Sequence, residues 1–392
     1  MRILTFTELF PNSIDPTHGI FIWQRCAHLA KLAGYEVIVV APVPYFPRWW
    51  KTRRWSKSSE LPEQETIGNL EVHHPRYFLL PRVSMPFHAL LMFLGCWRRI
   101  AHLNQQKKID CIDAHFVYPD GLAAILLGKV LGVPVCVSAR GTDINVYPSF
   151  KLIRPMIRWT LSRADAVIAV SAALKEAIAA LGVGRDDIHV IPNGVDPERF
   201  GFIAQEEARK KLGLPEKNPI LVSVGALIPS KGHERLIRAF ARVVLRHPGL
   251  QLYILGDGPL RSNLEYLATE LGISKSVHLL GKRPNKELSN WFCAAEASCL
   301  ISGREGWPNA VTESLACGTP VVATQTGGIP EIVQSAHLGV LVDDSEESLV
   351  EGIEQALAKK WEREQISQQT RMRTWDTVAA EVAAIIAALP KA

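Results

Sequence analysis

The chain has 392 residues, a length that predicts two domains, and 47% of them are hydrophobic and 21% charged, which excludes disordered and fibrous proteins. The formal net charge is only +5, and the basic excess lies within the first 110 residues, which carry 14 basic and 8 acidic side chains. Because nucleic-acid-binding proteins are more often basic throughout or carry a recognised module, we expect no nucleic-acid partner.

Short apolar runs alternate with helical patterns along the whole chain. In the N-terminal half the expected strands are Ile3–Phe6, Glu36–Ala41, Ile109–Asp113, Pro134–Ser138, Ala166–Val170 and Ile188–Ile191, and the expected helices are Ile20–Leu32, Gly121–Leu131 and Ala172–Leu181. In the C-terminal half the expected strands are Ile220–Val224, Leu252–Leu255, Val277–Leu280, Ala297–Ile301, Val321–Ala323 and Val340–Val342, and the expected helices are His233–Leu245, Leu260–Leu271, Asn285–Ala294 and Pro308–Ala316. This alternation predicts an α/β protein with two doubly wound parallel sheets.

A turn-rich and polar segment joins the two series of strands, and we place the domain boundary near Val195. The expected domains are therefore residues 1–195 and 196–371. Ligands of open parallel sheets bind beyond the carboxyl ends of the strands, so we expect the chemistry in the cleft between the two sheets.

The N-terminus and the cysteines both indicate a cytoplasmic protein. The first residues, MRILTFTELF, begin a strand without the basic segment and long apolar run of a signal peptide. None of the seven cysteines forms a C-x-x-C pair, and most lie in apolar runs, so we expect buried thiols in a reducing compartment.

The segment 302–331, SGREGWPNAVTESLACGTPVVATQTGGIPE, carries the densest signal. Glu305 follows an apolar strand, Pro308 suits the first turn of a helix, and Glu313 lies one to two turns into that helix. A helix N-terminus attracts phosphate and carboxylates accept hydrogen bonds from sugar hydroxyls, so the combination fits a sugar nucleotide. Taken singly, the two glutamates equally fit a loop residue and a surface helix residue.

This segment resembles glycosyltransferase family 4, the retaining enzymes of the GT-B fold. The family's E-x7-E hallmark matches Glu305 and Glu313, and the flanking motifs match Cys317–Pro320 and Gly327–Glu331. Other stretches that resemble the family are His18–Arg25, Asp113–Gly121, Ile191–Phe200, Val224–Gly232 and Leu255–Pro259. The similarity is greatest to bacterial cell-envelope and exopolysaccharide enzymes. It implies an N-terminal acceptor-binding domain, onto which a C-terminal helix (about 372–392) packs back, and a C-terminal donor-binding domain.

The resemblance also assigns roles to single residues. It implies that Lys231 neutralises the leaving diphosphate, that Glu305 positions the transferred sugar, and that His115 contacts that sugar. The donor-binding residues are expected to be Gly19, Lys231, Asn309, Ala310 and Glu313. Three of these residues have a plainer alternative. Lys231 fits a solvated lysine at a turn, His115 a structural histidine, and Gly19 a glycine that merely starts a helix.

Two departures from the family pattern concern charge. Ala226 stands where the family usually has an arginine beside the leaving group, and Arg140 stands where many members have a histidine. Arg140 is a candidate contact for an acidic acceptor or phosphate, with a surface salt bridge to Asp143 as the alternative. No D-x-D motif occurs in the chain, which favours an enzyme without a metal or other cofactor.

A basic and aromatic stretch, PYFPRWWKTRRWSK, covers residues 44–57. Tryptophan favours the membrane interface and basic residues are attracted to anionic lipids, so we expect a peripheral contact with the inner face of the cell membrane. The alternatives are a flexible basic loop, or one in which Trp49 and Trp50 line the acceptor site. The apolar run Phe87–Trp97, followed by Arg98 and Arg99, suits a helix on the same face.

Together these features predict a retaining hexosyltransferase that uses a nucleotide diphosphate sugar. The expected acceptor is a lipid-linked or cell-surface polysaccharide intermediate. Two alternatives are a sugar-nucleotide epimerase of the same architecture, which the E-x7-E string opposes, and a catalytically silent membrane-associated scaffold, which only Ala226 supports.

Overall fold

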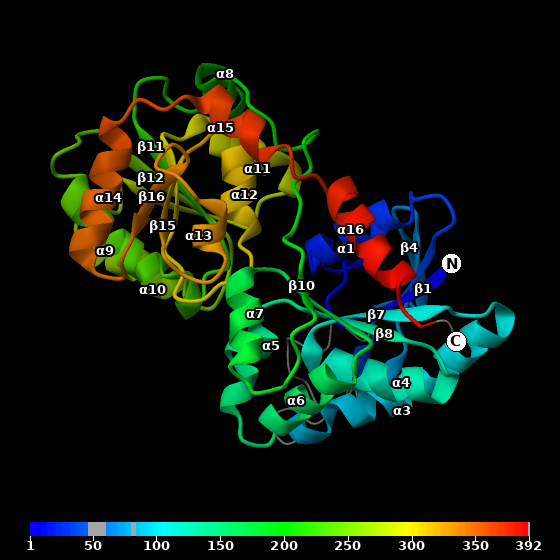
Figure 1. The fold of residues 1–392 in the computed structure, drawn as a ribbon. Helices are drawn as coiled ribbons and strands as arrows, with labels where there is room; N and C mark the ends of the chain where they lie inside the picture. The colour runs from blue at the N-terminus through cyan, green and yellow to red at the C-terminus, as the bar shows by residue number, and fades with distance from the viewer. Residues whose placement is uncertain (46–59, 80–83, 391–392) are drawn as a thin grey trace. The chain divides into compact units, whose positions relative to one another are not determined.

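The computed structural model describes residues 1–45, 60–79 and 84–390, and the chain forms two compact units (Figure 1). The N-terminal unit comprises Met1–Asn193 and the segment from Trp375 onward, and the C-terminal unit comprises Gly194–Thr374. The sequence-based boundary at Val195 lies two residues after Asn193. Within the described residues, no helix has the length and apolar character needed to cross a membrane.

The N-terminal unit is built on an eight-stranded sheet with the order β10-β9-β8-β7-β1-β2-β5-β4. Its strands are β1 (Arg2–Phe6), β2 (Glu36–Val40), β4 (Gln64–Ile67), β5 (Leu70–His73), β7 (Cys111–His115), β8 (Val135–Ala139), β9 (Ala166–Ala169) and β10 (Ile188–Val190). All neighbours are parallel except β4 and β5, which form an antiparallel hairpin that the sequence analysis did not predict. A separate parallel pair joins β3 (Val43–Tyr45) to β6 (Arg76–Phe78).

Helices cover both faces of this sheet, as buried parallel strands require. They are α1 (Ile20–Leu29), α3 (His88–Gln106), α4 (Leu122–Leu131), α5 (Thr142–Asn145), α6 (Arg154–Arg163), α7 (Ala172–Ala179) and α16 (Trp375–Ala387), with short turns η2 (Met85–Phe87), η3 (Val117–Gly121) and η4 (Tyr147–Ser149). Helices α1 and α16 pack together on one face, and α3, α4 and α6 lie on the other (Figure 1). The apolar run Phe87–Trp97 does lie in a turn and helix, as predicted.

The C-terminal unit has a six-stranded parallel sheet with the order β13-β12-β11-β14-β15-β16. Its strands are β11 (Ile220–Val224), β12 (Gln251–Leu255), β13 (Val277–Gly281), β14 (Ala297–Leu300), β15 (Val321–Thr324) and β16 (Gly339–Val342). Its helical elements are α8 (Gln205–Leu212), η5 (Pro229–Lys231), α9 (His233–Val243), α10 (Arg261–Glu270), α11 (Asn285–Ala294), α12 (Asn309–Ala316), α13 (Ile329–Ile332), α14 (Glu346–Ala358) and α15 (Arg363–Thr370). The two doubly wound parallel sheets that the sequence predicts are therefore present.

All seven cysteines are buried free thiols, as predicted. The strand orders also locate the switch points, where successive connections leave a strand toward opposite edges of a sheet. In the N-terminal unit the switch lies between β1 and β7, and in the C-terminal unit it lies between β11 and β14. These are the places where open α/β sheets bind ligands.

Candidate functional site

The loops after β11 and β14 meet at the switch point of the C-terminal unit. Lys231 lies in the first loop and Glu305 in the second, and the Gly303 N–H donates to the Ser230 carbonyl over 2.9 Å. A Cβ on Gly232, whose φ is +67°, would lie 1.9 Å from the Ile301 carbonyl oxygen. Glycine is therefore required at this point for the two loops to touch.

A third loop, after β15, packs onto the other side of the Glu305 backbone. A Cβ on Gly327 would lie 2.0 Å from the Glu305 carbonyl oxygen, and the Gly328 N–H donates to the Gly306 carbonyl over 3.2 Å. The Thr324 hydroxyl donates to the Ser302 carbonyl over 2.6 Å. Residues 302–306 are thus held between two neighbouring loops, so the backbone that carries Glu305 is fixed.

Lys231 and Glu305 form an ion pair, with 2.6 Å between Nζ and Oε1. The Lys231 side chain keeps 24% of its exposure and that of Glu305 keeps 9%, so the pair lies at the surface of the unit. Beside it, the Ser302 hydroxyl oxygen is buried without a hydrogen-bond partner in the structure as described. The sequence analysis assigned roles to both charged residues but did not predict their contact.

Helix α12 begins directly after this loop, with Asn309 and Ala310 as its first residues and Pro308 as its N-cap. Its first N–H groups have no carbonyl one turn earlier, so this end of the helix is suited to an anion. Burial raises the pKa of Glu313, in the second turn, to about 7, and the nearby Arg199 opposes the shift. Arg199 was not singled out from the sequence, although it lies within the Ile191–Phe200 motif.

Position 226, where the family usually has an arginine, carries an alanine. Ala226 is exposed. The nearby Arg235 donates to the Ile301 carbonyl over 2.9 Å and pairs with Asp344, so it is committed to the loop structure. Gly256 and Gly258, in the stretch Leu255–Pro259, pack against the backbone of Gly225 and Leu227, so packing alone requires glycine at both positions.

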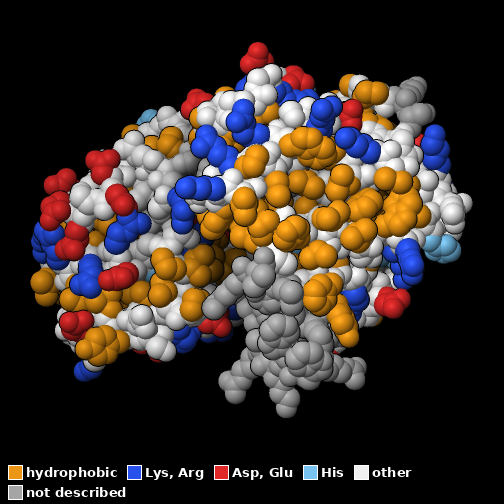
Figure 2. Space-filling view, turned by 90° about the horizontal axis from the view of Figure 1, so that it is seen from below, with side chains coloured by type: hydrophobic (Ala, Val, Ile, Leu, Met, Phe, Trp, Pro, Cys, Tyr) orange, Lys and Arg blue, Asp and Glu red, His pale blue; other side chains and the backbone are white. Residues whose placement is uncertain are grey.

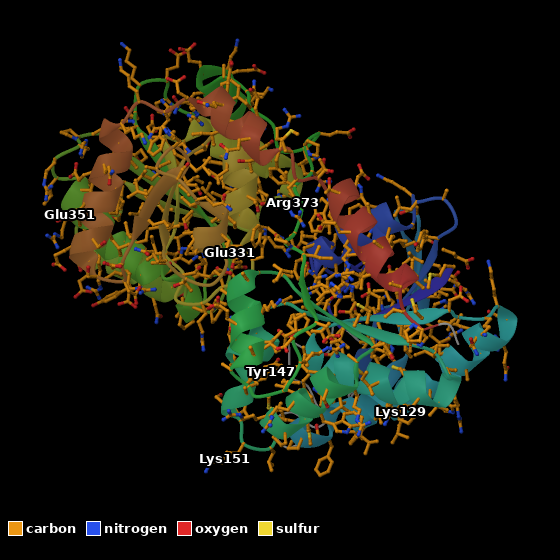
Figure 3. All side chains as sticks on the ribbon, in the orientation of Figure 1. Lys129, Tyr147, Lys151, Glu331, Glu351 and Arg373 are labelled. Carbon is orange, nitrogen blue, oxygen red and sulfur yellow. The ribbon has the colours of Figure 1, made fainter. Side chains whose placement is uncertain are left out.

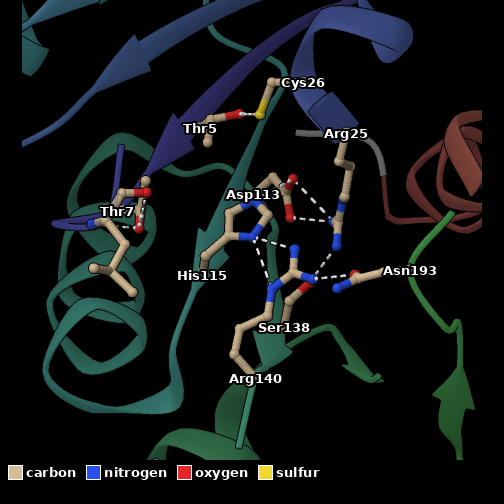
Figure 4. Close-up of polar contacts among 10 residues, drawn as sticks. Thr5, Thr7, Arg25, Cys26, Asp113, His115, Ser138, Arg140 and Asn193 are labelled. Atoms are coloured by element: carbon tan, nitrogen blue, oxygen red, sulfur yellow. Dashed lines mark hydrogen bonds and ion pairs between the residues drawn. The ribbon is translucent and has the colours of Figure 1, made fainter. Parts of the chain in front are cut away.

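A second polar cluster lies at the ends of β7 and β8 in the N-terminal unit (Figure 4). The Arg25 guanidinium donates to both carboxylate oxygens of Asp113, over 2.8 and 3.0 Å. The Arg140 guanidinium donates to His115 Nδ1, with its Nη2 at 2.6 Å, and to Asn193 Oδ1 at 3.1 Å. This side chain is 9% exposed, so the alternative of a surface salt bridge between Arg140 and Asp143 is wrong.

His115 is fully buried and neutral. Burial and the charges of Arg140 and Arg25 lower its pKa to about 3, although Asp113 acts in the opposite direction. Since Nδ1 accepts from Arg140, the proton of the neutral ring is on Nε2, which lies 3.2 Å from an Asp113 oxygen. The same cationic groups hold the pKa of Asp113 at about 2 despite its burial. The sugar contact expected of His115 stays a prediction.

The remaining expected residues fall into two groups. Gly19 caps α1 with φ +63°, and a Cβ there would lie 2.4 Å from the Leu9 carbonyl oxygen, so packing alone requires a glycine. Trp49 and Trp50 lie outside the described residues, as does most of the 44–57 stretch.

Comparison with known proteins identifies the family. Residues 19–199 match the protein family described as "Glycosyltransferase Family 4", and residues 204–373 match the family described as "Glycosyl transferases group 1". The chain is 30% identical over 377 residues to a putative teichuronic acid biosynthesis glycosyltransferase of Bacillus subtilis, an alignment that covers 93% of this chain and 90% of the relative. The chain belongs to glycosyltransferase family 4.

Another relative is named for a reaction on a phosphatidylinositol mannoside. A GDP-mannose-dependent phosphatidylinositol monomannoside mannosyltransferase of Mycolicibacterium smegmatis is 27% identical, with 86% of this chain and 85% of the relative covered. Solved structures share the GT-B fold. Sucrose-phosphate synthase from Thermosynechococcus elongatus has a TM-score of 0.80 at 18% identity, covering 98% of this chain and 97% of the other. Anabaena HepE in complex with UDP and glucose has a TM-score of 0.72 at 20% identity, covering 99% and 100%.

Proposed function

We propose that this family 4 glycosyltransferase transfers a hexose-type sugar from a nucleotide diphosphate donor to an acceptor hydroxyl, with retention of the anomeric configuration. The C-terminal unit would bind the donor and the N-terminal unit the acceptor. One observation carries the donor assignment. The Lys231–Glu305 pair lies next to the N-terminus of α12, at the switch point of the sheet.

In this proposal the donor separates the ion pair. A diphosphate has more charge to offer Lys231 than one carboxylate, so Lys231 turns to the phosphate and Glu305 is released to accept hydrogen bonds from the sugar. The first N–H groups of α12, at Asn309 and Ala310, would bind the phosphates, and Glu313 would accept from a ribose hydroxyl.

The reaction would follow a front-face route. The acceptor oxygen forms the new glycosidic bond on the face from which the diphosphate departs, and a phosphate oxygen takes the acceptor's proton. This route needs no carboxylate nucleophile, which leaves Glu305 to stabilise the sugar. Lys231 and the helix dipole would stabilise the charge on the diphosphate without a metal ion. Activity is therefore expected to persist in EDTA, and strict dependence on added magnesium or manganese would contradict this part.

The acceptor is proposed to be a lipid-linked or cell-surface polysaccharide intermediate, presented at the inner face of the membrane. Two relatives support this class by their names, one a putative glycosyltransferase of teichuronic acid biosynthesis and the other a phosphatidylinositol monomannoside mannosyltransferase. Arg140, which places a positive charge at the end of β8, would contact an acidic acceptor or phosphate, and His115 would contact the transferred sugar.

Titration calorimetry with UDP, GDP and their sugars tests the donor site. Lys231→Ala and Glu313→Ala are each expected to weaken the binding of the preferred nucleotide about tenfold or more, since a charge-assisted hydrogen bond contributes roughly 1.5–3 kcal/mol. Lys275→Ala, at an exposed lysine of the same unit, is the matched control and should bind as the wild type does. Unchanged nucleotide affinity in both site variants would show that the donor does not bind at this site.

A further inference from the structure

The outer side of α3 is apolar where a water-facing helix would be polar. Phe87, in the turn that leads into the helix, is 61% exposed, Leu90 is 46% exposed and Leu94 is 59% exposed. Their spacing of three and four residues places them on one stripe of the helix. The opposite stripe, which includes Met92 and Cys96, is buried in the unit. Helix α3 therefore presents apolar side chains both to the core and to its outer side.

Two further segments add apolar side chains to the same face of the N-terminal unit. Phe150 and Leu152, just before α6, are 45% and 65% exposed, and Val130 of α4 is 55% exposed. Helix α4 packs against both α3 and α6, so the three helices form one layer. Figure 2 looks onto the side where this layer lies in Figure 1, and hydrophobic side chains gather there with Lys and Arg among and around them. We call this surface the α3–α6 face.

The part of the chain that forms the α3–α6 face carries an excess of basic residues. Between Glu71 and Asp165 the sequence has twelve basic residues and only four acidic ones. Three of those four, Asp113, Asp120 and Asp143, are buried and do not reach the surface. The basic side chains that are exposed are Arg98, Lys107, Lys108, Lys129, Lys151, Arg154, Arg158 and Arg163.

Basic side chains of the α3–α6 face lie close to its exposed apolar side chains. Lys151 lies between Phe150 and Leu152 in sequence, and its side chain extends away from the fold in Figure 3. The Lys129 ammonium lies 4.9 Å from the centre of the Trp159 ring. Long basic side chains beside exposed apolar groups allow one surface to insert apolar groups while its charges stay in a polar layer.

We propose that the α3–α6 face binds an anionic lipid bilayer, with α3 lying in the plane of the membrane interface. Phe87, Leu90, Leu94, Phe150 and Leu152 would enter the boundary between headgroups and acyl chains, and the basic residues would contact anionic headgroups. Charge complementarity favours this occupant, because the inner face of a membrane has anionic headgroups over an apolar layer of acyl chains. The inference rests on the proposed function only in that a lipid-linked acceptor would give the contact a purpose.

Vesicle co-sedimentation of the full chain tests the proposal, with vesicles of phosphatidylcholine alone and with phosphatidylglycerol added. The variant Phe87→Ser/Leu90→Ser/Leu94→Ser is expected to need at least about tenfold more anionic lipid than the wild type for half-maximal sedimentation. The matched control is Leu245→Ser/Tyr266→Ser/Met372→Ser, at side chains of the C-terminal unit that are 71–80% exposed. This control should bind as the wild type does.

A second pair of variants tests the charges. Lys129→Gln/Lys151→Gln/Arg154→Gln is expected to lose preference for phosphatidylglycerol and to make the remaining binding less sensitive to salt. Lys210→Gln/Lys217→Gln/Lys275→Gln, at exposed lysines of the C-terminal unit, is the control for net charge and should leave the preference intact. The residues 46–59 stay unchanged throughout, so a loss of binding reports on the α3–α6 face. Thermal melts of every variant establish that it is folded.

Three results would overturn the proposal. They are equal vesicle binding by the wild type and the apolar variant, absence of binding by the wild type, and a wild-type dimer in sedimentation velocity that the apolar variant dissociates. The last would identify a second copy of the chain as the occupant. Because binding is measured without a donor, and donor hydrolysis is followed separately on the same samples, failure of the membrane contact is distinguishable from failure of the proposed function.

Discussion

Lys231 and Glu305 in the C-terminal unit differ sharply from His115 and Arg140 in the N-terminal unit, although each pair lies beside a switch point. The first pair is partly exposed and rests on a backbone fixed by close loop contacts. The second pair is buried, and Arg140 is hydrogen-bonded to both His115 and Asn193. A site that exchanges partners with a ligand needs accessible charges on a rigid backbone, whereas a site that holds one charge in place needs a closed network. This contrast predicts different responses to mutation.

The largest effect is expected from Glu305→Gln. Removing the carboxylate charge from the transferred sugar should lower turnover about 10²–10³-fold, the usual cost of losing one group aimed at the transition state. Nucleotide affinity should stay near that of the wild type, because Lys231 and α12 remain. Steady-state kinetics and calorimetry together measure the two quantities. Glu351→Gln, at an exposed position of α14, is the control, and normal turnover in Glu305→Gln would remove that residue from the site.

Arg140→Met tests the closed network. It removes the guanidinium that donates to His115 Nδ1 and Asn193 Oδ1, so we expect a loss of about 2–3 kcal/mol in the free energy of unfolding. The pKa of His115 should rise from about 3, since one of the charges that lowers it is gone. Chemical denaturation and a histidine NMR titration measure these two effects. Arg158→Met, at an exposed arginine, is the comparison, and equal stability of the two variants would contradict a closed network.

Gly327→Ala tests the rigid backbone under Glu305. A methyl group 2.0 Å from the Glu305 carbonyl oxygen must move that loop, so turnover should fall about tenfold in addition to a stability loss of roughly 1–2 kcal/mol from the left-handed backbone. Gly272→Ala is a matched control, because Gly272 has φ +72° with nothing within 4 Å. It should lose stability alone. Equal turnover in both variants would show that the loop does not need this contact.

The smallest effect is expected from Glu313→Gln, and it is a change in stability that depends on pH. The folded-state pKa of Glu313, about 7, lies above the ordinary value of 4.5, so ionisation opposes folding and stability falls as pH rises between these values. Glu313→Gln should therefore match the wild type near pH 4 and exceed it by about 1–2 kcal/mol at pH 8.5. Melting curves of both proteins, beside Glu351→Gln, measure the difference. A constant difference across this range would show that Glu313 ionises normally.

Most of the fold was predictable because buried parallel strands are short, apolar and alternate with helices. The β4–β5 hairpin was missed because Gln64–Ile67 is a polar edge strand, and α8 was missed because its sequence, QEEARKKL, is almost entirely charged or polar. The candidate donor residues followed from the E-x7-E spacing and the family resemblance. The contact between Lys231 and Glu305 did not, because 74 residues separate them and only the adjacency of β11 and β14 brings them together.

The polar network of the N-terminal unit was less accessible to sequence reasoning for the same reason. Arg140 contacts His115, 25 positions earlier, and Asn193, 53 positions later. Its neighbour Asp143 was the alternative partner inferred from sequence, but that carboxylate instead accepts from the backbone N–H groups of Val117, Arg140 and Gly141. A sequence pattern gives the type of residue at a strand end, whereas the partner depends on the strand order.

The path of the chain through the two units has a consequence for its synthesis on the ribosome. Helix α16 completes the core of the N-terminal unit, where Trp375 and Val382 pack in one cluster with Ile22 and Cys26 of α1, and Asp376 bonds His28 over 2.6 Å. The C-terminal unit is a continuous segment inserted before that helix. The unit synthesised second can therefore finish folding first, while the unit synthesised first keeps one face of its core uncovered until α16 emerges. During that interval the apolar face of α1 that α16 later covers stays exposed to water.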